Sequence, residues 1–290
     1  MTDQTTLPPL VAPGSTGTAE AAPDGTLFRH PARQKPRMRP LKAFGHFRQL
    51  LKDKEDTSQV FHIFESLPSR DFVPMARSLA LSEQGERLRA TEPYLPDVLD
   101  DHATLRKLPK GTVAHAYCDF MEAEGLSAAG LVEEHNRFFG DRPKYGDLIE
   151  WYASRRRDTH DLLHVLTGFG RDPLGEQCVL AFTHGQNGGL GNLFIAYLGA
   201  LHIARTAPET RGRKAPVVKA VRQAQKLGKG APRVTDISIR DLLAMPLDEA
   251  KAMLKIPTGR TLYEDCHRIW RENGIDPYSL ITDKQGLAAA

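Results

Sequence analysis

The stretch HDLLHVLTGFGRDPLGE, residues 160–176, concentrates four potential metal ligands, which are His160, Asp161, His164 and Glu176. On a helix the two histidines are four residues apart, so their imidazoles share one face and lie about 6 Å apart along the axis. Gly168, Gly170 and Pro173 break the helical pattern before Glu176, which places that carboxylate at the start of the next helix. We therefore expect a pair of helices to close on one cation.

The donor set of two imidazoles and two carboxylates narrows the choice of ion. It suits Zn²⁺ or Fe²⁺, and it suits Mg²⁺ less well because Mg²⁺ prefers all-oxygen sites. We expect Zn²⁺, with Fe²⁺ and Mg²⁺ as alternatives. Asp161 either binds the ion or hydrogen-bonds a ligand histidine. Because the anions nearly neutralise a divalent ion, positions stay free for water or a substrate oxygen, which is typical of a catalytic site.

The His160–Asp161 doublet also fits a second class of protein, the HD-type phosphohydrolase. That site needs an upstream histidine and a distant aspartate as further ligands. His135, in EEHNRF, could be the upstream ligand, but the context singles out no downstream aspartate. The phosphohydrolase therefore stands as a less favoured alternative.

Composition describes a globular chain that is not built for nucleic acid. Its 290 residues are 40% apolar, which is enough for a substantial core, and the net charge is only +3. Neither an RNA-binding signature nor a paired-cysteine finger is present, so nucleic acid is not an expected partner. The three cysteines form no CxxC, which fits a reducing compartment and argues against a disulfide framework or a sulfur metal site. We expect Cys178 to pack in the core.

Hydrophobic periodicity predicts an all-α fold, or nearly so. VTDISI, at 234–239, is the only alternating strand candidate. The expected helices cover 40–53, 57–67, 70–80, 83–89, 111–124, 127–138, 145–167, 176–182, 193–201 and 247–254.

Three segments within this pattern carry more specific expectations. The arginine run at 155–157 predicts a solvated face, although one arginine could point at an anionic substrate. HGQNGGLGN, from 184 to 192, predicts a break and is not a phosphate loop. The apolar segment LFIAYLGAL, 193–201, is too short to span a bilayer and predicts a buried core helix. Alternatively, its small residues leave a groove for an apolar ligand; these are Ala196, Gly199 and Ala200.

The charge distribution divides the chain into three expected parts. Residues 1–36 form a leader that we expect to be disordered; it lacks Lys and Arg up to residue 26 and matches neither a presequence nor a secretory signal. Residues 37–257 would be a helical metal- and lipid-binding domain, and 258–290 a C-terminal extension. Two basic segments, 29–54 and 205–233, flank apolar helices, so an anionic membrane surface is an expected partner.

At HDLLHVLTG followed by LGE, the chain resembles the coenzyme Q (ubiquinone) biosynthesis protein 4 family. The signature of that family is HDxxHxxxG followed by a glutamate, and Gly168 and Glu176 have its spacing. The likeness continues through LPKGTVAHAYCDFMEAEGL and DLLAMPLDEAKAMLKIP, so it covers roughly residues 40–257.

The resemblance implies a multi-helix orthogonal bundle with an apolar cleft beside a metal site on His160, Asp161, His164 and Glu176. It implies C1 decarboxylation coupled to hydroxylation of a polyprenylated hydroxybenzoate, or a non-catalytic lipid-binding scaffold that organises the other ubiquinone-biosynthesis enzymes. A prenylated benzoate or quinone lipid and those enzymes would be partners, and a homodimer is possible. The implied location is peripheral, on the cytoplasmic face of a bacterial inner membrane or the matrix side of a mitochondrial one.

Overall fold

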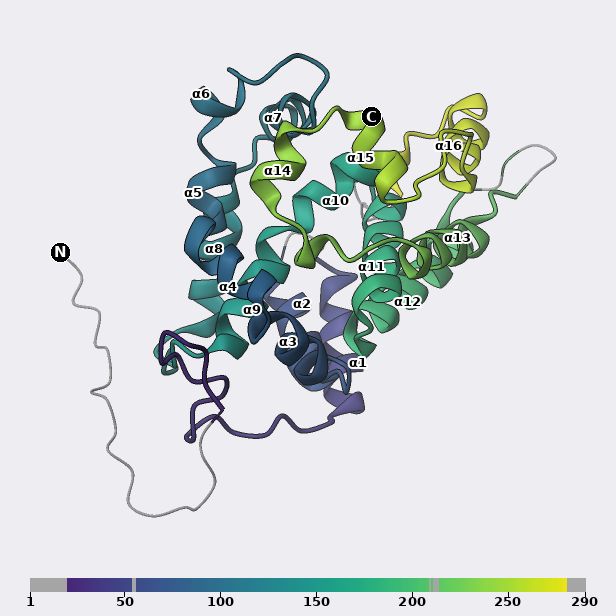
Figure 1. Ribbon diagram of the computed structural model, residues 1–290. Helices are drawn as coiled ribbons and strands as arrows, with labels where there is room; N and C mark the ends of the chain where they lie inside the picture. Colours follow the sequence, from purple (N-terminus) through teal and green to yellow (C-terminus); the bar gives the residue numbers. More distant parts are fainter. Residues whose placement is uncertain (1–19, 54–55, 209, 211–213, 281–290) are drawn as a thin grey trace.

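The computed structural model describes residues 20–53, 56–208, 210 and 214–280. Across these ranges the chain forms helices, two isolated β-bridges and no strand, which confirms the all-α prediction (Figure 1). The α-helices are α1 (Pro40–Leu50), α2 (Thr57–Ser66), α3 (Phe72–Ala80), α4 (Glu83–Thr91), α5 (Leu95–Leu99), α6 (His102–Leu105), α7 (Val113–Glu124), α8 (Ala128–Phe139), α9 (Leu148–Asp158), α10 (His160–Thr167), α11 (Pro173–Asn187), α12 (Leu190–Thr206), α13 (Val217–Gly230), α14 (Ile239–Ala244), α15 (Leu247–Met253) and α16 (Leu262–Glu272).

The centre of the fold is the packing of α11 against α12 and α13, which lie together in the right half of Figure 1. Glycines let α11 and α13 approach backbone to backbone. A Cβ at Gly185 would lie 2.3 Å from the Gln225 carbonyl oxygen, and one at Gly228 would lie 2.1 Å from that of Phe182. This close approach buries the apolar faces of both helices in the main core, which also receives α7, α10 and α16.

The expected single helix over 145–167 is wrong, because the chain forms two helices that meet at Thr159. Thr159 has φ −88° and ψ 2°, and its hydroxyl donates to the carbonyl oxygens of Arg155 and Arg156 at 3.1 and 3.2 Å. Such local side-chain bonds compete with the helical pattern. The break makes His160 the first residue of α10, so the ligand pair starts a new helix instead of continuing an old one.

The predicted strand at 234–239 is also wrong, and so is the solvated arginine run. The segment forms a short 3-10 helix, η1 (Val234–Asp236), and then enters α14. Its backbone is satisfied by a side chain instead of a neighbouring strand: Arg155 donates to the carbonyl oxygens of Thr235 at 2.7 Å and Ile237 at 2.6 Å. Arg155 is 2% exposed and pairs with buried Glu92 at 2.9 Å, and the other two arginines of the run are half-buried.

The glycine-rich segment interrupts the helices less than expected. Helix α11 runs on to Asn187, and the turn is confined to Gly188 and Gly189, whose φ values of +64° and +99° favour glycine. Helix α12 then contains the apolar segment and buries one face of it, as predicted for a core helix. The alternative groove is filled, because the Gln177 side chain of α11 lies 2.4 Å from where a Cβ of Gly199 would be. No helix in the described part of the chain has the length and apolarity to cross a membrane.

Both ends of the expected central domain continue into packed structure. Residues 1–19 of the expected leader lie outside the described residues, but 20–36 pack against the start of α9. There, Phe28 is 2% exposed and Arg33 forms an ion pair with Asp147 at 2.6 Å. In the expected C-terminal extension, α16 places Trp270, 1% exposed, in the main core. Residues 281–290 again lie outside the described part.

Candidate metal centre

The site is assembled from the starts of two helices, α10 and α11. The Nε2 atoms of His160 and His164 are 3.4 Å apart, and an Oε atom of Glu176 lies 3.6 Å from each of them. Four ligands at about 2.1 Å from one zinc ion are separated by about 3.4 Å in a tetrahedral arrangement. The three side chains therefore have the separations of ligands that share one ion.

The hydrogen bonding of His164 leaves its ligand nitrogen free. Nδ1 of His164 lies 2.8 Å from the carbonyl oxygen of Phe169, which can only accept, so Nδ1 carries the proton. In the neutral ring, Nε2 therefore carries the lone pair on the side of His160 and Glu176, where a metal ion would use it. This is the arrangement by which metal-binding histidines are commonly oriented. The turn after α10 allows it, because Gly168 adopts φ +75° and directs the Phe169 carbonyl back to the ring.

Asp161 lies with the two histidines in a group that does not include Glu176, so the histidines belong to two overlapping sets of three candidate ligands. One ligand atom each of His160, Asp161 and His164 lies within 4.8 Å of the other two. The Asp161 carboxylate also affects a tyrosine of α7: burial, and then the charge of Asp161, raise the pKa of Tyr117. The Tyr117 hydroxyl is buried and, among the described residues, makes no hydrogen bond. In the sequence, Tyr117 shares the helical spacing of Val113 and Met121, which predicts an apolar stripe and gives no sign of a role at the site.

The electrostatics of the site favour an ionised glutamate. Loss of hydration would raise the pKa of Glu176, but the imidazoles of His164 and His160 outweigh it and hold the pKa below its usual range. The side chains of Glu176 and His160 are 30% and 29% exposed, whereas that of His164 is fully buried. The ligand group is thus fixed on its inner side and open to solvent on the other.

A buried polar network supports the start of α11 and was not predicted from the sequence. The Asp172 carboxylate is 0% exposed and accepts from the backbone N–H groups of Leu174 and Gly175 at 3.1 and 3.2 Å. From α16, the Tyr263 hydroxyl donates to Asp172 at 2.5 Å, and Nε2 of His267 lies 3.1 Å from it. The N–H of Glu176 donates to the Asp172 carbonyl oxygen, so this network fixes the turn that carries the glutamate.

Two further expectations about the site have different outcomes. His135 is not in the ligand group; its ring contacts those of Phe61 and Phe139, at centroid distances of 5.3 and 5.6 Å. The phosphohydrolase interpretation therefore lacks its upstream ligand.

A cavity of about 210 Å³ lies at the end of α10, lined by Thr167, Gly168 and mostly polar residues of the 248–264 region. An apolar cleft beside the metal centre stays a prediction.

These features define a class: an all-α protein with a solvent-open, histidine- and carboxylate-rich candidate metal centre between two helix starts. The chain belongs to the coenzyme Q (ubiquinone) biosynthesis protein Coq4 family, whose model matches residues 49–259. The structure adds residues 20–48 and 260–280 to that matched region, including α16.

Individual relatives carry related names. The chain is 23% identical to the human mitochondrial ubiquinone biosynthesis protein COQ4 homolog over 225 residues, 73% of this chain and 82% of that protein. It is 28% identical over 103 residues to two mosquito (Culex quinquefasciatus) COQ4 homologs, which covers 36% of this chain and only 43% and 36% of theirs. A crystal structure from Nostoc punctiforme matches with a TM-score of 0.51 and 18% identity, covering 77% of this chain and all of that one; it shows the fold.

Proposed function

We propose that this protein acts in ubiquinone biosynthesis as a metal-dependent enzyme that replaces the C1 carboxyl of a polyprenylated hydroxybenzoate with a hydroxyl. The observation that carries the proposal is the convergence of two imidazole nitrogens and a carboxylate oxygen, 3.4–3.6 Å apart, on a face open to solvent. Structural zinc sites are closed by four protein ligands, whereas catalytic ones keep a position for substrate. The family and the names of the relatives supply the pathway.

The protein side chains would hold the ion and orient the substrate, and the ion would supply Lewis acidity. His160, His164 and Glu176 would hold the ion. Asp161 is a hydrogen-bond partner of a histidine, or a fourth ligand at an ion that accepts the substrate as a fifth. A bound Zn²⁺ would polarise the substrate carboxylate and fix C1 for reaction. Arg171 lies 3.7 Å from Glu176 and is one-third exposed, so its guanidinium can attract the anionic group to the open side. The Phe120 ring, stacked on His164 at 5.5 Å, gives the aromatic ring of the substrate an apolar neighbour.

The overall exchange is an oxidation by two electrons. The ring carboxylate and one water become a ring hydroxyl, CO₂ and one proton, and two electrons leave the ring. Dioxygen accepts these two electrons, with two protons, as hydrogen peroxide. Zn²⁺ does not change its oxidation state. With that ion the oxidant must therefore react with the electron-rich phenol itself, a restriction that iron would remove.

The prenyl chain and the membrane define where this chemistry would occur. The first helix presents apolar side chains beside basic ones: Leu41 is 88% exposed and Phe44 is 50% exposed. Helix α2 packs between α1 and α12, and at the start of α12 the side chain of Leu190 is half-exposed. We propose that this side meets an anionic membrane surface peripherally, on the cytoplasmic side in a bacterium or the matrix side in a mitochondrion. Other enzymes of the pathway and a second copy of the chain are proposed partners.

The test compares His164→Ala with a matched control, His184→Ala. His184 has the same local geometry, since its Nδ1 lies 2.9 Å from the carbonyl oxygen of Gly189, five residues later, but it belongs to no ligand group in the described structure. Metal content and conversion of a prenylated hydroxybenzoate are measured for both. We expect His164→Ala to lose both, and His184→Ala to keep them. Product formed by metal-free His164→Ala would refute the mechanism.

Two other outcomes separate the alternatives. A protein that retains metal, copurifies with prenyl lipid and assembles with the pathway enzymes, yet never turns over substrate, is a scaffold. Release of phosphate from a nucleotide or a prenyl phosphate would instead identify a phosphohydrolase.

A further inference from the structure

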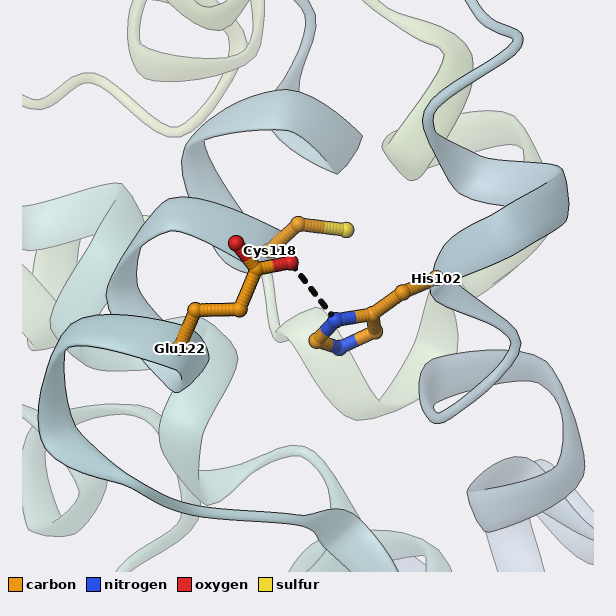
Figure 2. Close-up of side chains that lie close together, drawn as sticks. All are labelled: His102, Cys118 and Glu122. Carbon is orange, nitrogen blue, oxygen red and sulfur yellow. Dashed lines mark hydrogen bonds and ion pairs between the residues drawn. The ribbon is translucent and has the colours of Figure 1, made fainter.

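A second group of metal-ligand side chains lies where α6 packs against α7, away from the HDxxH sequence. Cys118 and Glu122 are four residues apart on α7 and so share one face. His102, at the start of α6, reaches toward the same face (Figure 2). One ligand atom of each residue lies within 4.8 Å of the other two, and in Figure 2 the sulfur, the carboxylate and the imidazole surround a common point.

The surroundings of this group fix the carboxylate and balance its charge. Oε1 of Glu122 lies 3.1 Å from Nδ1 of His102, while Oε2 accepts from Arg106 at 2.8 Å. Arg106 is itself paired with Asp119 at 2.6 Å, which offsets the guanidinium charge. The oxygen that faces the group is therefore oriented by a partner on the other oxygen, as is common around metal ligands.

We propose that His102, Cys118 and Glu122 bind a second divalent ion, with Zn²⁺ as the fitting cation, which clamps α6 to α7. A thiolate, an imidazole and a carboxylate together form a donor set that zinc accepts in tetrahedral sites, with water as the fourth ligand. The lack of a CxxC argued against sulfur ligation, but here the sulfur donor acts alone and its partners come from 16 residues upstream and four downstream.

Proton release is a built-in consequence of this ligand set. Burial raises the pKa of the Cys118 thiol, so the sulfur is protonated when no ion is bound. Zinc binding therefore displaces the thiol proton and weakens as the pH falls.

The clamp would connect the second site with the candidate metal centre through helix α7. Helix α7 also carries Phe120, which stacks on His164. An ion that fixes α6 against α7 would hold the helix on which this ring contact depends. We therefore expect the second ion to raise the unfolding temperature without being required for metal binding at the first site.

Cobalt distinguishes the two sites, because only the second has a sulfur ligand. Co²⁺ is added to metal-free full-length protein, and the near-ultraviolet absorption of sulfur-to-cobalt charge transfer is recorded with the bound metal per chain. The wild-type protein should show this band and bind one equivalent more than Cys118→Ser. The His164→Ala protein should keep the band, since its first site has no sulfur.

Two exposed carboxylates on the same helix give a matched pair for variants that leave the buried sulfur intact. Glu122→Gln removes a proposed ligand and should abolish the band. Asp119→Asn removes the other carboxylate partner of Arg106 and should retain it. No band in the wild-type protein, or equal bands in wild type and either Cys118→Ser or Glu122→Gln, would overturn the assignment.

Discussion

The buried tyrosine of α16 is where the C-terminal segment meets the metal centre, and Tyr263→Phe tests that contact. The substitution deletes only the hydroxyl, which donates to Asp172 at 2.5 Å and accepts from the N–H of Gly170 at 2.9 Å. Burial and the Asp172 charge raise the pKa of Tyr263, so the hydroxyl remains a donor at neutral pH. A hydrogen bond to a charged group is worth about 1.5–3 kcal/mol and a neutral one about 1 kcal/mol. We expect unfolding to become easier by about 3 kcal/mol.

The same change should reach the metal ligands. Asp172 caps the helix that carries Glu176, and loss of an outer support commonly weakens metal binding by about 10- to 100-fold. We expect about tenfold weaker zinc affinity, measured by competition with a chelator, beside urea unfolding. The control is Tyr278→Phe, because the Tyr278 hydroxyl makes only a long hydrogen bond, 3.4 Å, to Glu124 and the side chain is 43% exposed. If the free energies of unfolding of both variants lie within about 0.5 kcal/mol of the wild-type value, α16 does not support the metal centre in this way.

Three further predictions concern the scaffold, and urea unfolding measures each. Gly185→Ala should destabilise the protein by about 1–3 kcal/mol, because the added methyl group meets the backbone of α13. Gly45→Ala has nothing within 4 Å of the added methyl group and should stabilise α1 by up to about 1 kcal/mol. Equal effects of the two substitutions would contradict the close contact between α11 and α13. Glu92→Gln should cost about 3–5 kcal/mol because it leaves the buried Arg155 charge uncompensated; a cost below 1 kcal/mol would mean that water reaches the pair. Burial, with nearby arginines, lowers the pKa of His135 to about 4, so the unfolded chain binds its proton first as the pH falls below about 6.5. Because His135 is only partly buried, solvent screening reduces the effect of this shift. Wild type should therefore lose about 1–2 kcal/mol more than His135→Gln between pH 7 and 4, and parallel pH profiles would refute this.

Much of the fold was predictable because its signals are local. Apolar spacing every three or four residues located most of the helices, including α2 (Thr57–Ser66) and α15 (Leu247–Met253). One of the errors arose where a side chain far away in the sequence decides the backbone. VTDISI alternates like a strand, yet Arg155 from α9 satisfies its carbonyl groups, and no periodicity of residues 234–239 contains that information.

The sequence by itself determined which side chains meet at the candidate metal centre, because the two histidines are one helical turn apart and the glutamate follows a short, glycine-broken link. What only the tertiary structure decided is what surrounds them. The carbonyl that orients His164, the Tyr263–Asp172 support from α16, and the grouping of His102 with Cys118 all depend on where the chain returns in space. Local spacing fixes which side chains share a helix face, but packing between helices decides which distant side chains complete their hydrogen bonds and charges.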